Sequence, residues 1–332
     1  MNEQQYRFHQ LQETDVDLLN LLLETASEIH GRKADNIEWL KWKYFGSPFG
    51  KAISIIALTS DNKIAGEVTF GCYEFFLSSK IIPCIISYQT MVHPNHQKKG
   101  LFLKLTDKVL DIARTKQIGL VFNFPNQASF KPFVKMNFTP INHIKNWVNF
   151  SNLLNTILNI KSLKSPFFAD NIDTVSDVQL KIFEELKDSI TPLKLNDTLV
   201  PNRTYSFIKW RYFTYPLYNY QILKNNMGWA IIRTGKRGKL KEVQIMEIFP
   251  HNDNPTNLFI KHLKKSIKTV FNPNIILFNL SENHPSTVFI KNNFFFSLPH
   301  SINFFAKSLN PNYNHLINKD SWIITPTEFH RY

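Results

Sequence analysis

An internal repeat constrains this chain of 332 residues more than any other feature of its sequence. Residues 40–48 read LKWKYFGSP, and residues 208–216 read IKWRYFTYP. A second pair follows in the same order, with FVKMNF at 133–138 and FIKNNF at 289–294. Two matches in the same order indicate a tandem duplication. We therefore predict a first domain at 1–150, a linker at 151–170 and a second domain at 171–332.

The composition agrees with two globular domains, each with its own core. The chain is 43% hydrophobic and 14% aromatic, and its length corresponds to two domains of about 150 residues. The longest apolar run, at 81–86, is far shorter than the ~20 residues that span a membrane. Cys72 and Cys84 form neither a disulfide framework nor a zinc-binding spacing. We expect a cytoplasmic protein without a metal.

Hydrophobic periodicity predicts α/β units of mixed structure. Apolar residues at helical spacing predict helices at 14–29 and 100–116, and a shorter helix at 128–136. Strands are predicted at 53–58, 64–70, 81–92 and 120–124. The second copy is expected to repeat this plan in a degenerate form.

The stretch from 88 to 102, YQTMVHPNHQKKGLF, carries the clearest chemical signal. A strand ends at a proline, a short basic loop follows, and Gly100 opens a helix. The first amides of a helix have no partner within it, and its dipole is positive at that end. Glycine allows a phosphate to approach the backbone, and Lys98 and Lys99 add positive charge. This pattern predicts a site for a pyrophosphate, although the Walker pattern is absent.

Two motifs in this half resemble the fingerprints of the GNAT superfamily of acyl-CoA-dependent N-acyltransferases. Q/R-x-x-G-x-G/A is matched by Gln97, Gly100 and, imperfectly, Phe102. The second fingerprint, which begins with asparagine, aligns with Asn126, Ser129 and the FVKMNF segment. The resemblance covers about residues 5–145, and it implies a mixed, mostly antiparallel sheet flanked by helices in each copy.

The resemblance also implies where acyl-CoA binds. The strand at 88–92 diverges from its neighbour, and its backbone at Met91 and Val92 pairs with the pantetheine arm. The oxyanion of the reaction is stabilised by an amide near Thr90 or Met91. The remaining residues implied at the cofactor are Gln97, Lys98, Lys99, Gly100, Leu101 and Phe102 around the pyrophosphate, and Asn126, Ser129 and Phe133 toward the thioester. Phe133 stands where many relatives have a tyrosine that protonates the leaving thiolate.

The group that accepts the proton of the amine is not fixed by the sequence. The strand at 87–92 contains no glutamate, so Glu67 and His93 are the two candidates. The alternatives are a solvated strand carboxylate for Glu67 and a turn residue for His93. The residues expected at the acceptor are Arg32, Trp39, Lys43 and Tyr44. Against this, Trp42 recurs as Trp210, which favours a structural role for that segment.

The second copy lacks the pyrophosphate motif. Residues 248–257 contain neither glycine nor lysine, and Glu282 and Pro285 stand opposite Asn126 and Ser129. We predict one CoA site per chain, and a second domain that helps to form the acceptor pocket.

The net charge of +13 favours an anionic acceptor. Tandem GNAT chains of this length resemble bacterial sugar N-acyltransferases of surface-polysaccharide and lipopolysaccharide O-antigen pathways. Some of these act on nucleotide-linked amino sugars, including a 3-hydroxybutyryl-CoA-dependent type that uses a dTDP-3-amino-3,6-dideoxyhexose. The expected partners are therefore acyl-CoA and an anionic nucleotide sugar, without nucleic acid or a membrane span. The alternatives are a Fem-like transferase that uses aminoacyl-tRNA and a non-catalytic basic binding protein.

Overall fold

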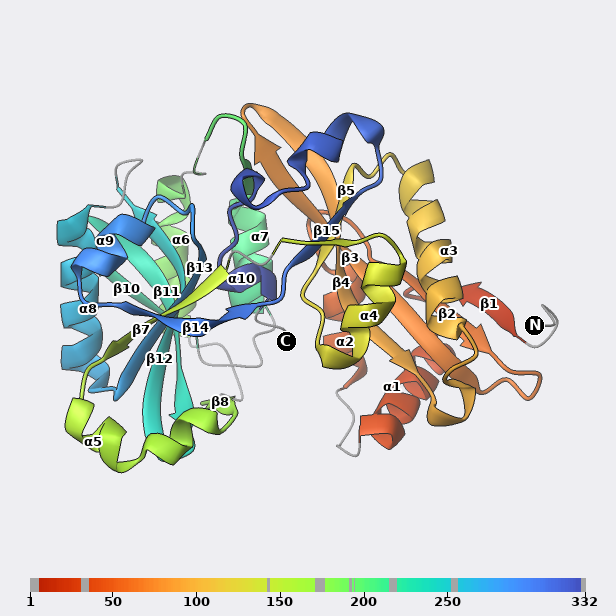
Figure 1. The fold of residues 1–332 in the computed structure, drawn as a ribbon, viewed down its shortest axis with the longest axis horizontal. Helices are drawn as coiled ribbons and strands as arrows, with labels where there is room; N and C mark the ends of the chain where they lie inside the picture. The colour runs from red at the N-terminus through yellow and green to blue at the C-terminus, as the bar shows by residue number, and fades with distance from the viewer. Residues whose placement is uncertain are drawn as a thin grey trace. The chain divides into compact units, whose positions relative to one another are not determined.

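The computed structural model describes residues 6–30, 36–141, 144–170, 177–190, 193, 195–214, 220–251 and 256–329. The chain forms two compact units (Figure 1). Unit 1 comprises Met1–Ile141 and Phe304–Ile317, and unit 2 comprises Asn142–Asn303 and Asn318–Tyr332. Neither unit is continuous in sequence, so these bounds differ from the domains predicted at 1–150 and 171–332. The segment predicted as a linker, 151–170, lies within unit 2.

The sheet of unit 1 is mixed and mostly antiparallel. Among the described residues, the neighbours β4 and β5 run parallel and the other neighbours in the strand order run antiparallel. The strand order is β1 (Arg7–Gln10), β2 (Ile53–Leu58), β3 (Ile64–Leu77), β4 (Lys80–Val92), β5 (Leu120–Asn123), β15 (Phe305–Ser308) and β6 (Thr139–Pro140).

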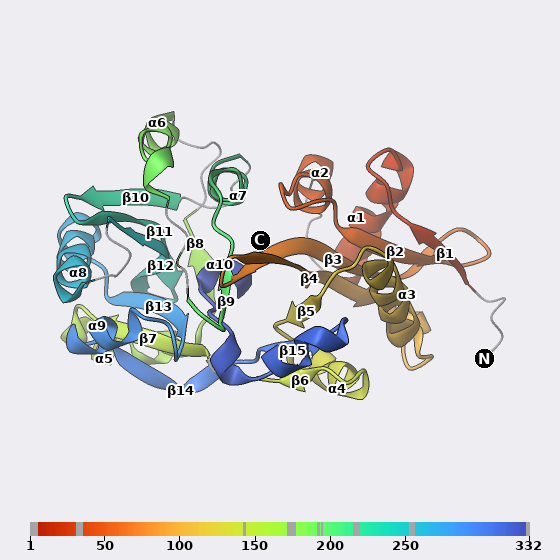
Figure 2. The same cartoon turned by 90° about the horizontal axis from the view of Figure 1, so that it is seen from above.

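Helices cover both faces of this sheet (Figure 2). α3 (Leu101–Thr115) presents Leu101, Leu105 and Val109 at a spacing of one helical turn, and these side chains join the core with Val68. Successive strand residues point to opposite faces. Glu67 therefore points to the other face, where Tyr44 of α2 reaches it. The remaining helices of unit 1 are α1 (Val16–His30), α2 (Ile37–Phe45), η2 (Pro94–His96), α4 (Gln127–Lys135) and η6 (Pro311–Leu316).

Unit 2 repeats this plan around a second sheet. Its strand order is β10 (Tyr220–Asn225), β11 (Gly228–Arg237), β12 (Leu240–Pro250), β13 (Ile275–Ser281), β7 (Ile144–Phe150) and β14 (Phe296–Ile302), with β8 (Phe167–Ala169) on β11. Only β12 and β13 are parallel among these neighbours. α8 (Asn257–Phe271) packs on the sheet as α3 does in unit 1. The other elements are α5 (Leu153–Leu158), η3 (Ile160–Lys164), α6 (Asp177–Glu185), η4 (Lys187–Ser189), β9 (Leu199–Pro201), α7 (Tyr205–Lys209), the π-turn Trp210–Thr214, α9 (Thr287–Asn292), η7 (Lys319–Ser321) and α10 (Pro326–Phe329).

The two halves of the chain exchange one strand. β15 lies beside β5 in unit 1, with Ala306 opposite Phe122, and β7 lies beside β13 in unit 2, with Trp147 opposite Phe278. Phe122 and Phe278 belong to the same repeated FN pair, so the two strands occupy equivalent places. Each sheet is thus completed by a strand from the other half of the sequence.

The predicted fold class is confirmed, because both units are mixed α/β structures with mostly antiparallel sheets and flanking helices. Among the described residues, no helix combines the length and apolar character that crossing a membrane requires.

Candidate functional site

The central parallel pair of unit 1 diverges along its length. β5 pairs with β4 only from Cys84 to Ile86, whereas β4 continues to Val92. Tyr88 interrupts the register between β4 and β3 as a bulge, which bends a strand away from its neighbour. Within the described residues, no strand pairs with the β5-facing edge of residues 87–92. Thr90, Met91 and Val92 therefore lie on a strand edge open to a further extended ligand.

The loop after this edge leads into α3, whose first amides receive no hydrogen bond from an N-cap side chain. Gly100 is the N-cap of α3, has a φ of 70°, and provides no side-chain hydrogen bond to the first amides of the helix. Lys98 also has a positive φ, of 60°, and its side chain is exposed. Gln97 donates from Nε2 to the carbonyl of Val92 at 3.1 Å, and Lys99 donates from Nζ to the carbonyl of Asn95 at 3.0 Å. The loop presents amides and positive charge, as an anion site requires.

Phe102 is partly buried and packs against Phe133, which belongs to the core. Phe133 is 2% exposed, and the rings pack edge to face with centroids 5.4 Å apart. This contact explains the large residue at 102, where the fingerprint has a small one. The side chains of Phe133 and Leu101 both lie in this core. Their expected places, Phe133 toward the thioester and Leu101 at the pyrophosphate, stay predictions.

The end of β5 adds a residue that the sequence analysis missed. Asn123 is fully buried, and neither atom of its side-chain amide has a hydrogen-bond partner among the described residues. A buried polar group without a partner costs about 1–3 kcal/mol, so such an amide indicates a ligand or an ordered water. The signal in the sequence was the FN pair that recurs at 278–279. Nearby, Asn126 caps α4 by accepting from the amide of Ser129 at 3.0 Å.

A buried carboxylate lies on the opposite face of the sheet. Glu67 is 0% exposed and accepts hydrogen bonds from Tyr44 and Thr69 at 2.6 Å each, and from Ser54 at 3.3 Å. All three reach Oε1, while the buried Oε2 has no partner among the described residues. Burial raises the pKa of Glu67, and burial next to this carboxylate raises that of Tyr44 well above its usual value. The interpretation of Glu67 as a solvated strand carboxylate is wrong.

The residues expected at the acceptor gather around this carboxylate. The ammonium of Lys43 lies 4.6 Å from the centroid of the Trp39 ring and 5.8 Å from that of Tyr88. Trp39, Lys43 and Tyr44 are all buried, so the three form an interior cluster rather than an open surface. Arg32, the fourth of these residues, lies outside the described residues.

His93 stands apart from the Glu67 cluster. Its ring accepts from the amide of Asn95 at 3.3 Å, and its Nε2 lies 3.7 Å from the carboxylate of Glu28. It lines a polar pocket of about 540 Å³ together with α1 and the turn between β2 and β3. His96, in the same pocket, has a pKa lowered by burial and by Lys99. The two candidate proton acceptors therefore lie in different environments.

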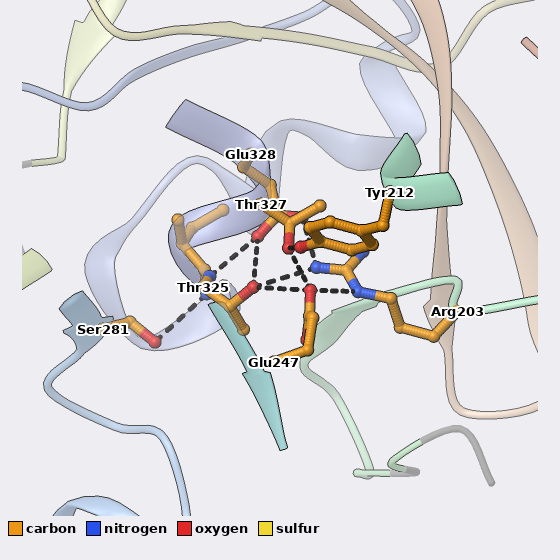
Figure 3. A network of polar contacts seen from close by, with 8 residues as sticks. Arg203, Tyr212, Glu247, Ser281, Thr325, Thr327 and Glu328 are labelled. Carbon is orange, nitrogen blue, oxygen red and sulfur yellow. Dashed lines mark hydrogen bonds and ion pairs between the residues drawn. The ribbon is translucent and has the colours of Figure 1, made fainter. Parts of the chain in front are cut away.

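The corresponding region of unit 2 is partly occupied by the C-terminal segment of the chain. β12 pairs with β13 only up to Ile245, so this parallel pair also diverges. Residues 322–325 lie beside the end of β13, where Ile324 donates to Ser281 Oγ at 3.2 Å and Ser281 donates back to the carbonyl of Ile324 at 3.0 Å (Figure 3). Trp322, Ile323 and Ile324 are at most 1% exposed. The C-terminal segment thus lies beside the diverging strands of unit 2, whereas no described strand pairs with the corresponding edge of unit 1.

Among the described residues, no group of three or more His, Cys, Asp or Glu side chains is arranged to hold a metal ion.

In unit 1 a diverging pair of parallel strands is followed by a helix that begins at a glycine. This is the arrangement that the two sequence motifs implied, and comparison with known proteins agrees with it. Residues 7–138, which belong to unit 1, match the family profile "Acetyltransferase (GNAT) domain". No curated protein matches the chain.

Solved structures share the fold over nearly the whole chain. A GCN5-related N-acetyltransferase from Kribbella flavida is 12% identical with a TM-score of 0.54, over 92% of this chain and 72% of that one. Another from Anabaena variabilis is 11% identical with a TM-score of 0.59, over 92% and 73%. N-myristoyltransferase from Saccharomyces cerevisiae, with bound myristoyl-CoA and inhibitors, is 10% identical with a TM-score of 0.58, over 92% and 81%.

Proposed function

We propose that this protein is an acyl-CoA-dependent N-acyltransferase that binds one acyl-CoA in unit 1. The observation that carries the proposal is the open edge of residues 87–92 beside the uncapped helix at Gly100. An acyl-CoA offers an amide-containing arm and a pyrophosphate in the same order. The N-myristoyltransferase that shares the fold carries myristoyl-CoA, which supports this class of substrate.

Each part of CoA has matching groups in unit 1. The amides at residues 101–103, together with Lys98 and Lys99, suit the pyrophosphate because they combine the helix dipole with positive charge. The edge of Thr90–Val92 can pair with the amides of pantetheine as a strand would. Asn123 can also contact CoA, because neither its amide nitrogen nor its amide oxygen has a hydrogen-bond partner among the described residues.

In the reaction, the neutral amine attacks the thioester carbonyl, and the carbonyl oxygen becomes an anion that accepts from the amide of Thr90 or Met91. The C–S bond then breaks, the amide product forms, and the CoA thiolate leaves and takes up a proton. The nitrogen must lose a proton along the way. We assign this proton to Glu67, which lies opposite Met91 on β3 and keeps Oε2 without a partner among the described residues. Its raised pKa makes it a stronger base than an ordinary carboxylate.

The acceptor in this proposal is the amine of a nucleotide-linked amino sugar used in surface-polysaccharide synthesis. The net charge of +13 supports an anionic acceptor, and the family resemblance supports a sugar amine. Within the cluster around Glu67, the proposed proton acceptor, the positive charge is that of the buried Lys43.

The experiment is a thiol-release assay with acetyl-CoA and 3-hydroxybutyryl-CoA against dTDP-linked amino sugars and the free sugars. We expect release only with an amine acceptor, and faster release with the nucleotide-linked form. Glu67→Gln keeps an oxygen for Tyr44 and Thr69, and should lower kcat by about 10²–10⁴-fold. His93→Asn should change kcat little. Loss of activity in His93→Asn with full activity in Glu67→Gln would reverse the assignment, and no release with any amine would overturn the proposed function.

A further inference from the structure

Unit 2 contains a pocket of its own at the point where β12 and β13 diverge. Its volume is about 80 Å³, whereas a single water needs about 10–15 Å³. Apolar side chains, among them Val200, Phe249, Phe278 and Ile323, form much of the lining. The polar lining includes Arg203, Glu247, His284 and Ser286. A pocket of this kind fits a small ligand with an apolar body and one polar end.

Glu247 directs one of its oxygens to a dense polar network and leaves the other unused (Figure 3). Oε1 accepts from Arg203 Nε at 2.7 Å, from Thr325 Oγ1 at 3.1 Å and from Thr327 Oγ1. No described residue donates to Oε2, although only 5% of the residue is exposed. Because Glu247 lines the pocket, Oε2 is the acceptor it has left for a ligand.

A second residue of the pocket lining, Ser286, offers another buried acceptor. Ser286 is fully buried, and its Oγ has no hydrogen-bond partner among the described residues. The backbone amide of Ser286 donates to His284 Nδ1 at 3.1 Å, so the position of this segment is fixed without use of the hydroxyl. Two buried oxygens therefore lack a donor in one small pocket.

The charges around the pocket select the kind of donor. Glu247 and Glu328 share the single guanidinium of Arg203, which reaches Glu328 at 2.5 Å. Burial lowers the pKa of His284 to about 4, so this ring is neutral at pH 7. Burial raises the pKa of Tyr212 well above its usual value, so this phenol is neutral at pH 7. A second buried cation, Arg211, lies against the Tyr212 ring. In the ion-paired group next to the pocket, the two carboxylates of Glu247 and Glu328 share the one guanidinium of Arg203, which disfavours an anionic ligand beside Glu247 and favours a cationic one.

We propose that this pocket binds a primary ammonium group carried on a short apolar chain, with Glu247 Oε2 and Ser286 Oγ as its acceptors. The ammonium supplies three donors and the missing positive charge, and the carbon chain contacts the apolar lining. This site belongs to unit 2 alone and is independent of CoA. Burial and the charge of Glu328 raise the pKa of Glu247, and a bound ammonium should lower that pKa again.

The probe is n-butylammonium, titrated calorimetrically into the full-length protein without CoA at pH 7 and constant ionic strength. n-Butanol and n-butyrate have a similar chain with a neutral and an anionic end. We expect n-butylammonium to bind at least about tenfold more tightly than either, since removal of a charged hydrogen bond corresponds to a factor of about 10–100.

Two variants test the assigned oxygens. Glu247→Gln should weaken binding of n-butylammonium about tenfold or more, and Ser286→Ala should weaken it severalfold. Glu282→Gln is the matched control, because this carboxylate is exposed, pairs with Lys145, and should leave binding unchanged. If Glu247→Gln does not fold, Ser286→Ala carries the test. Equal affinity for n-butanol, unchanged binding in Ser286→Ala, or no binding of n-butylammonium would overturn the proposal.

Discussion

Replacement of Arg203 by methionine should strongly destabilise unit 2. The guanidinium is only 7% exposed and pairs with Glu247 and Glu328, whose side chains are 6% and 0% exposed. Methionine fills a similar volume but leaves two buried carboxylates without a positive charge. Loss of one partner of a buried ion pair costs about 3–5 kcal/mol, and we expect a loss of stability of that size at pH 7.

The loss should depend on pH with a definite sign. In the native protein the pKa of Glu247 is already raised, chiefly by burial and then by the charge of Glu328, while Arg203 lowers it. Without Arg203 the folded-state pKa of Glu247 rises further. A carboxyl with a raised folded pKa favours folding at low pH, and this advantage disappears as pH rises through that pKa. The penalty of Arg203→Met should therefore be largest near neutral pH and shrink toward about pH 4, the region of an unperturbed glutamate.

The assay is urea unfolding at several pH values, followed by tryptophan fluorescence. Trp322 reports on the C-terminal segment of unit 2 because it is fully buried there. Arg114→Met, which breaks an exposed pair with Asp111, is the control and should have little effect. A triple variant, Arg203→Met with Glu247→Gln and Glu328→Gln, should recover much of the loss at pH 7. A loss below about 1 kcal/mol, or one that does not change with pH, would refute this reasoning.

Two further predictions concern unit 1. Phe102→Ala removes the edge-to-face contact with Phe133. It should lower the free energy of unfolding in urea by about 1–3 kcal/mol while the affinity for CoA changes less than twofold. A large loss of CoA affinity with unchanged stability would contradict the packing role of Phe102. Tyr44→Phe removes a hydrogen bond to Glu67, so it should cost about 1–2 kcal/mol and raise the pKa of Glu67 further. The acidic limb of the pH–kcat profile should then move to higher pH, and an unmoved limb would argue against Glu67 as the proton acceptor.

The repeat allowed the two-unit fold to be predicted, but not the exchange of strands. β7 and β15 are both short strands that can pair with a buried parallel strand, and nothing local distinguishes a neighbour in the same half from one in the other. Pairing between distant segments is decided by the whole fold. The boundaries at 150 and 171 assumed that each domain is one continuous segment of sequence. An exchanged strand makes each unit discontinuous.

The backbone of the candidate site was easier to predict than its side chains. Gly100 opens α3, as the sequence predicted, and β4 diverges from β5 as the resemblance implied. Side chains were harder to place, because burial depends on elements far away in sequence. Glu67 is buried because α2 brings Tyr44 over it, and Phe133 is in the core because Phe102 packs against it. The apolar run at 322–324 was the available signal that the C-terminal segment is interior, and it was overlooked.

The most direct test of the account is the number of CoA molecules bound per chain. Calorimetric titration of the native chain with CoA should give one site, and Gly100→Glu should abolish it by adding a side chain and a negative charge at the uncapped helix. Asn62→Glu is the matched control, because it places the same charge on a residue with a φ of 59° in the turn between β2 and β3. One site that is lost only in Gly100→Glu is the predicted result. Two sites would show that unit 2 also binds CoA, and no binding would contradict the assignment of unit 1 as an acyl-CoA site.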